Sequence, residues 1–237
     1  MMEVLYEDNH VIVVSKPQGV PSQADESGDK DMLTMVKEYV KEKYNKPGEV
    51  FIGLVHRLDR PTGGVMVFAR TSKAASRLAE QMKEGDFDKT YFAVVCGRPR
   101  EAKGKIVSFL KKDPKTNMAM IVPQTEEGAK RAELDYEVLE HNPETKRTLV
   151  KVKLYSGRGH QIRVQMKSIK CPIFGDQKYG GESMPKVMLN LFASELSFYH
   201  PTTKQKLIFR VYPPEAESAW NEFRLEKYLS LKTNYDD

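Results

Sequence analysis

Cysteine is scarce in this chain, with only Cys96 and Cys171 among 237 residues. Two cysteines support neither a disulfide framework nor a cysteine-based zinc site, and reduced thiols are typical of the cytoplasm. No run approaches the roughly 20 apolar residues of a membrane span, and the first residues lack the basic-then-apolar pattern of a secretory signal. We therefore expect a cytoplasmic protein with no membrane partner and, by default, a monomer.

Several other chemistries lack their usual residues. The histidines stand singly, at positions 10, 56, 141, 160 and 200, and no pair is spaced to hold a metal. No Gly-x-Ser-x-Gly elbow of a serine hydrolase occurs. Gly157-x-Gly159 opens like a dinucleotide fingerprint, but Ile162 stands where the third glycine belongs. Neither a metal site nor a dinucleotide site is therefore predicted.

The formal net charge of +5 is modest but unevenly distributed. Residues 145–170 contain eight Lys or Arg and no acid, whereas residues 1–31 contain two basic residues and seven acids. A further seven basic residues against two acids fall in 98–123. This polarity favours a basic face and a polyanionic partner such as RNA. The alternative is a solvated strand face balanced in space by acids from elsewhere. The residues expected to contact phosphates are Lys146, Arg147, Lys151 and Lys153.

Apolar spacing and capping residues predict the helices. One is expected over 31–44 with Asp31 as its cap, and one over 72–84 with Thr71 or Ser72 as cap and Gly85 as its end. Others are expected over 159–168 and, as an amphipathic helix, near 216–231. Strand patterns cover 4–14, 51–55, 65–69, 89–96, 105–110, 117–122, 132–140, 148–155, 187–198 and 205–212. Their close spacing favours antiparallel pairing and an α+β fold in one compact domain over 1–237.

The segment His56-Arg57-Leu58-Asp59, followed by Arg60-Pro61-Thr62-Gly63-Gly64, joins two of these strands. It sets one carboxylate between arginines in a loop, where functional residues are common and where an acid is expected to stay ionised. The alternative for Asp59 is an ordinary surface ion pair. A glycosidase that uses paired carboxylates would need a second acid, and the sequence points to none.

A second candidate segment runs from Gly157 to Arg163. A strand, a glycine turn and a helix N-terminus could face an anion, and Arg158 and His160 add side-chain donors. Tyr91 begins the strand pattern at 89–96. It is either a core tyrosine or an aromatic ring that stacks on an extruded base.

Five separated motifs together resemble the RluA-like family of pseudouridine synthases, enzymes that isomerise chosen uridines in RNA. The match covers residues 4 to about 214. The ordered set is specific where each motif alone is not. The motifs are Leu5-Tyr6-Glu7-Asp8 with Val14-Ser15-Lys16-Pro17-Gln18-Gly19, His56-Arg57-Leu58-Asp59, Lys89-Thr90-Tyr91-Phe92-Ala93, Gly157-Arg158-Gly159-His160-Gln161-Ile162-Arg163-Val164 and Gly175-Asp176-Gln177-Lys178-Tyr179-Gly180.

The resemblance implies one catalytic α+β domain around a mixed, largely antiparallel sheet flanked by helices, with the active site in a basic cleft. It implies no cofactor or metal, and ribosomal or transfer RNA as partner. Many members also carry a small S4-like RNA-binding domain. Here the pattern begins at residue 4, so we expect the catalytic domain itself to recognise the RNA.

By the same resemblance, Asp59 is the catalytic carboxylate, acting as nucleophile at the ribose anomeric carbon or as base at the ribose 2′ position. Arg163 supplies the opposing charge, and Tyr91 stacks on the flipped uracil and helps remove its C5 proton. Arg57 fills the space that the uridine leaves. The other residues implied to bind substrate are His56, Arg60, Thr62, Arg158, His160, Gln161 and Ile162.

Two residues depart from the family pattern. Gly63 stands where Ser or Thr is usual, and Gln165 stands where His is common. We expect both to affect RNA docking more than catalysis. Two other functions stay open on the sequence: an RNA-binding assembly factor that has lost the chemistry, and a carboxylate hydrolase of nucleosides or glycosides.

Overall fold

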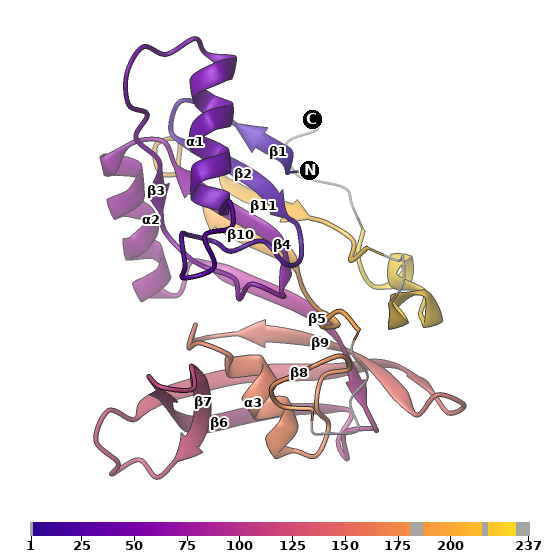
Figure 1. The fold of residues 1–237 in the computed structure, drawn as a ribbon. Coiled ribbons are helices and arrows are strands. Elements are labelled where there is room, and N and C mark those ends of the chain that lie inside the picture. The colour runs from indigo at the N-terminus through magenta and orange to yellow at the C-terminus, as the bar shows by residue number, and fades with distance from the viewer. Residues whose placement is uncertain (1, 181–186, 215–217, 231–237) are drawn as a thin grey trace. The chain divides into compact units, whose positions relative to one another are not determined.

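The computed structural model describes residues 2–180, 187–214 and 218–230, and the chain divides into two compact units (Figure 1). Unit 1 comprises the described residues up to 88 and those of 193–211. Unit 2 comprises the described residues of 89–192 and 212–230. The strand predicted over 187–198 lies within the described residues and corresponds to β10, Leu191–Tyr199.

Unit 1 is built on strands β1, β2, β4, β10 and β11, with helices α1 and α2. Strand β2 lies between β1 and β4, β10 lies beside β4 and pairs with β11, and the short β3 pairs with one end of β4. The bounds are β1 Glu3–Glu7, β2 Val11–Lys16, α1 Met32–Lys43, β3 Gly53–Leu54, β4 Gly63–Ala69, α2 Ser72–Glu84, β10 Leu191–Tyr199 and β11 Lys206–Arg210.

Local sequence signals set the ends of both helices in unit 1. The Asp31 carboxylate accepts the Thr34 N–H at the start of α1, and the Thr71 hydroxyl accepts the Ala74 N–H at the start of α2. Gly85 ends α2 in the left-handed conformation at φ +89°, which costs glycine no steric strain. Both helices are therefore confirmed with their predicted caps.

Part of the core of unit 1 lies on the sheet face that α2 covers. Ala74 and Leu78 of α2 pack there in one buried apolar cluster with alternate residues of β2 and β4. Strands β4 and β10 approach closely at Gly64, where an added Cβ would lie 2.2 Å from the Ala193 carbonyl oxygen. This contact and a φ of +123° make glycine necessary immediately after the Asp59 loop.

Unit 2 is an antiparallel sheet in the order β5-β9-β8-β6-β7, with α3 packed against β6 and β7. The bounds are β5 Asp88–Cys96, β6 Lys103–Asp113, β7 Met118–Val122, β8 Lys130–Asn142, β9 Arg147–Leu154 and α3 Gln161–Ser168. The α+β class predicted from the strand spacing is confirmed.

The segment near 216–231 differs from its prediction. Its described residues form two short 3-10 helices, Ala219–Glu222 and Leu225–Lys227, and no continuous amphipathic α-helix. Phe223 separates them in an extended conformation, with φ −129° and ψ 149°. Of the residues that suggested helical spacing, Trp220, Phe223 and Leu225 are buried and Tyr228 is partly buried, so burial and not a helix accounts for the pattern. The prediction's outer residues 216, 217 and 231 lie outside the described residues.

Candidate active site

The loop that carries Asp59 is held through its main-chain carbonyl groups. Every carbonyl oxygen from residue 58 to residue 62 accepts a hydrogen bond, and most of the donors come from residues 16–22. The loop is therefore fixed independently of what its side chains do. In order along the loop, the donors are the Ser22 hydroxyl (2.8 Å), the Thr62 N–H (2.9 Å), the Gly19 N–H (2.9 Å) with Lys16 Nζ (3.1 Å), the Gln18 amide (2.9 Å) and again Lys16 Nζ (2.8 Å).

The two arginines that flank Asp59 differ in their surroundings. Asp59 itself is partly buried. Arg60 donates to the Gly19 carbonyl (3.0 Å) and forms ion pairs with Asp25 and Asp29. Arg57 is exposed, and within the described residues its side chain has no hydrogen bond or ion pair. Of the two, Arg57 is thus the side chain available to a ligand.

His56 and Thr62 stand at the two ends of the loop. The His56 ring accepts the Val67 N–H at Nε2 (3.0 Å), so one ring nitrogen is used to bind the chain to β4. The Thr62 side chain is 2% exposed, and its hydroxyl oxygen has no hydrogen-bond partner within the described part of the chain. A buried hydroxyl without a partner costs about 1 to 3 kcal/mol.

Lys16 lies beneath this loop with a fully buried side chain. Besides the two loop carbonyls, its Nζ donates to the Pro17 carbonyl (3.0 Å). Burial lowers the pKa of Lys16 to about 7, although the nearby Asp59 carboxylate opposes the shift and Arg60 adds to it. An ammonium has three hydrogens for three carbonyl acceptors, whereas the neutral amine has two.

The depressed pKa of Lys16 has a consequence for stability. The unfolded chain, with a lysine pKa near 10.5, binds more protons than the folded protein between pH 7 and 10.5, so folding stability gains from rising pH there. In Lys16→Met, this increase of folding stability with pH should be absent. In the parent it amounts to at most about 1.4 kcal/mol per pH unit. Urea unfolding at several pH values between about 7 and 9.5 measures it.

The matched control is Lys41→Met, which changes an exposed lysine of α1. It should keep the pH dependence of the parent. Equal slopes for the Lys16 variant and the parent would show that Lys16 does not titrate in this range.

Tyr91 lies on β5 in unit 2, 6% exposed, opposite Val152 of β9. Side chains alternate along a strand, so Tyr91 and Val152 share the sheet face that Lys151 and Lys153 do not. Lys89, two residues earlier, is on the face of Tyr91, and burial lowers the pKa of Lys89. Its Nζ lies 3.7 Å from the position of a Cβ added to Gly157, so β5 and the glycine turn meet here.

Arg163 of α3 forms a buried bidentate ion pair with Asp176. Its Nε and one terminal nitrogen lie 2.8 and 2.7 Å from the two carboxylate oxygens, and the side chains are 4% and 0% exposed. The carboxylate also accepts the N–H groups of Lys178 and Tyr179. Such a fork fixes the orientation of the guanidinium group, and removing one partner would strand the other charge in the interior.

His160 and Tyr179 contact each other at the N-terminal end of α3. The Tyr179 hydroxyl oxygen lies 2.8 Å from His160 Nδ1 and accepts the Ala119 N–H at 2.8 Å. His160 adopts the left-handed conformation (φ +56°), and its side chain does not cap the helix.

The remaining predicted residues of this segment divide into interior and surface positions. Gln161 and Ile162 are 3% and 4% exposed, and the Gln161 amide oxygen accepts from the Ser156 hydroxyl and the Arg158 N–H. Gln161 therefore shapes the turn. Arg158 is exposed and donates to the Arg131 carbonyl (3.1 Å).

Gln165 corrects one expectation, and Arg147 has partners that the sequence did not indicate. Gln165 is fully buried, and its amide donates to Ile106, Ser108 and Ala132, so this departure from the family pattern affects the packing of α3 and not an RNA-facing surface. Arg147 forms an ion pair with Glu222 and stacks over the Phe174 ring at 3.8 Å. It is thus engaged inside unit 2, and its contact with phosphate stays a prediction.

Residues 10–168, more than half of the chain, match the family model for RNA pseudouridylate synthase. The chain belongs to this family. An uncharacterized RNA pseudouridine synthase of Aquifex aeolicus is 35% identical over 226 residues, covering 90% of this chain and 70% of that protein. The dual-specificity RNA pseudouridine synthase RluA of Vibrio parahaemolyticus is 33% identical, covering 96% and 91%. Pseudouridine synthases are isomerases, so the chain is an enzyme of that class.

Solved structures show the pseudouridine synthase fold as well. Human RNA pseudouridylate synthase domain containing 4 superimposes with a TM-score of 0.74 at 23% identity, covering 90% of this chain and 89% of that one. Human RNA pseudouridylate synthase domain containing 1 gives a TM-score of 0.70 at 23% identity. In this pseudouridine synthase, the described residues contain no helix able to cross a membrane and no group of three potential metal ligands.

The predicted site residues of this synthase fall into the two units. His56, Arg57, Asp59, Arg60 and Thr62 share one loop of unit 1. Tyr91 and the residues of 158–163 belong to unit 2. Sequence reasoning assigned no role to Lys16, Ser22 or Asp176. Lys16 and Asp176 lie inside the motifs of the family resemblance. These motifs indicated the two positions but did not predict their contacts.

Proposed function

We propose that this chain isomerises uridine to pseudouridine in structured RNA, with Asp59 as its catalytic carboxylate. The observation that supports this most is the Asp59 loop, whose five carbonyl oxygens all accept hydrogen bonds. A reacting group must be held in one geometry, and these hydrogen bonds hold the main chain of its loop.

The reaction is an isomerisation and needs no oxidant or co-reactant. The N1–C1′ glycosidic bond of uridine breaks, uracil turns, and a C5–C1′ bond forms. The proton on C5 is lost and N1 gains one. Asp59 either attacks C1′ or removes the 2′ proton, and both routes need the ionised carboxylate.

Three other residues complete the proposed machinery. Tyr91 stacks on the uracil of the extruded nucleotide and assists removal of the C5 proton. Arg163, oriented by Asp176, supplies positive charge to the same nucleotide. Arg57, exposed on the loop, fills the stack that the uridine leaves. Thr62, whose buried hydroxyl lacks a partner within the described residues, is a further proposed contact.

The proposed substrate is ribosomal or transfer RNA. One relative is named ribosomal large subunit pseudouridine synthase D of Yersinia pestis, 32% identical and covering 100% of this chain and 72% of that protein. Deleting the gene and comparing pseudouridine maps of all cellular RNA with the parent strain identifies the modified positions.

Tritium release from RNA labelled at uracil C5 tests the reaction. We expect stoichiometric release with pseudouridine as product, because forming the C5–C1′ bond expels the C5 hydrogen. An assembly factor that only binds RNA would release none. A nucleoside or glycoside hydrolase would instead yield free uracil or sugar, and either outcome would overturn the proposed activity.

A further inference from the structure

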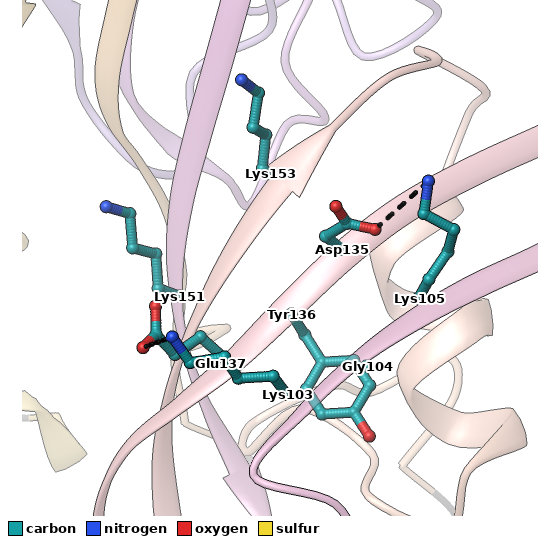
Figure 2. A pocket seen from close by; sticks show the side chains of 8 residues that line it. All are labelled: Lys103, Gly104, Lys105, Asp135, Tyr136, Glu137, Lys151 and Lys153. Carbon is teal, nitrogen blue, oxygen red and sulfur yellow. Dashed lines mark ion pairs between the residues drawn. The ribbon is translucent and has the colours of Figure 1, made fainter.

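A groove of about 480 Å³ crosses the sheet of unit 2 (Figure 2). It is formed by strands β6, β8 and β9, and its lining residues carry a net charge of +2. Figure 2 shows Lys151 and Lys153 pointing to one side of β9, whereas the Tyr136 ring points away from them. The lining residues are Lys103, Gly104, Lys105, Asp135, Tyr136, Glu137, Lys151 and Lys153.

Strand register arranges these charges in two rows across the sheet. Lys105, Asp135 and Lys153 lie opposite one another in the first row, and Lys103, Glu137 and Lys151 form the second. Each row has lysines on the outer strands and a shorter acid on the middle strand. Long side chains therefore form the two walls and carboxylates form the floor. Adjacent strands are about 4.8 Å apart, so the lysine walls stand roughly 10 Å apart.

The acids of the floor are engaged mainly with the β6 wall. Lys103 Nζ lies 2.7 Å from Glu137, and Lys105 Nζ lies 2.8 Å from Glu133 and 3.8 Å from Asp135. The Tyr155 hydroxyl donates to the other Asp135 oxygen at 2.8 Å. These contacts compensate the acids of the floor from the side of β6.

Helix α3 does not cover this face. Gln165 of α3 donates to the Ser108 hydroxyl at 2.9 Å, which places Ser108 on the helix side of β6. Lys103 and Lys105 differ from Ser108 by odd numbers of residues and so point to the opposite side. By the same alternation, Tyr91 is on the side away from Lys151 and Lys153. The groove is thus separate from the face that Tyr91 occupies.

An exposed aromatic ring extends the groove along β9. Tyr155 is 51% exposed, and the Nζ atoms of Lys105 and Lys153 lie 5.1 and 5.6 Å from its ring centroid. A solvent-facing tyrosine flanked by lysines is the combination on which single-stranded nucleic acid stacks and is held by its phosphates.

From these observations we infer that the groove across β6, β8 and β9 is a docking surface for the RNA substrate outside the catalytic loop. Phosphates contact the β9 wall at Lys151 and Lys153, and a base stacks on Tyr155. The inference rests on the proposed function for the identity of the ligand. It identifies the surface that holds an RNA segment beyond the target uridine.

The test measures RNA affinity against salt concentration for Lys151→Gln/Lys153→Gln in an Asp59→Asn background. The probe is an oligonucleotide copy of a natural substrate. Each lost phosphate contact should lower the slope of log affinity against log salt by about 0.7, so the double variant should lose about 1.4. Using Asp59→Asn keeps docking apart from chemistry. If the groove does not bind RNA, only this binding assay departs from its expected result. If the proposed function is wrong, the parent protein releases no tritium.

The matched control is Lys73→Gln/Lys83→Gln, which removes two exposed lysines of α2 in unit 1. It should keep the slope of the parent. Lys151→Arg/Lys153→Arg should keep it too, because charge and not the lysine shape is required. Lys153→Gln alone should lower the salt slope by half as much as the double variant. This single variant keeps the test possible if the double variant does not fold. A slope for Lys151→Gln/Lys153→Gln equal to the parent's, or an equal loss in the control, would overturn the inference.

Discussion

Asp59→Asn is expected to abolish pseudouridine formation and to leave RNA affinity nearly unchanged. The substitution keeps the shape of the side chain and removes its charge, and the loop is held by carbonyl oxygens that do not involve it. Loss of an essential catalytic group commonly lowers a rate by about 10⁴ or more. Single-turnover tritium release at saturating RNA is the measurement, with affinity measured in parallel.

Two results would contradict this assignment. Substantial residual isomerisation by Asp59→Asn would falsify the catalytic role of the carboxylate. A loss of RNA affinity as large as the loss of rate would place Asp59 in binding. Ser22→Ala is a useful comparison, because it removes a hydrogen bond to the loop and leaves the carboxylate in place. A partial loss of rate is expected from it.

Arg163→Met is expected to lower both activity and stability. The buried Asp176 carboxylate would lose its bidentate partner, and breaking a buried pair in this way costs about 3 to 5 kcal/mol. Arg163→Lys should recover only part of either property, since an ammonium lacks the planar fork. Urea unfolding and single-turnover rates are the two measurements.

The double variant Arg163→Met/Asp176→Asn separates the two roles of the arginine. Neutralising Asp176 removes the stranded charge, so stability should return while the rate stays low. If stability and rate returned together, Arg163 would have only a structural role. If Arg163→Met turned over at the parent rate across neutral pH, the proposed catalytic role would be wrong.

Features encoded over a few residues could be predicted from the sequence. The caps at Asp31 and Thr71 and the left-handed end at Gly85 are chemical signals within one turn of their helices. Strand patterns placed β5 to β9 to within a few residues. The helix near 216–231 failed because buried aromatic residues gave helical spacing without a helix.

Contacts between distant residues could not be predicted from one sequence. Ser22 and Leu58 are 36 residues apart, and Lys16 and Thr62 are 46 apart. Nothing local indicates that a serine or lysine will donate to a particular carbonyl. Gln165 illustrates the same limit, because its position relative to the family motif suggested an RNA contact and only the packing of α3 shows it to be internal.

The way the Asp59 loop is held also bears on how this enzyme can change over evolution. Its fixed points are peptide carbonyls, which every amino acid possesses, and the donors stand elsewhere in the chain. The side chain at position 57 can therefore be exchanged with little effect on the path of the loop. Lys16 and Ser22 differ in this respect, since few replacements could donate hydrogen bonds as they do. We expect a saturation library to tolerate diverse residues at 57 for folding, and few at 16 and 22.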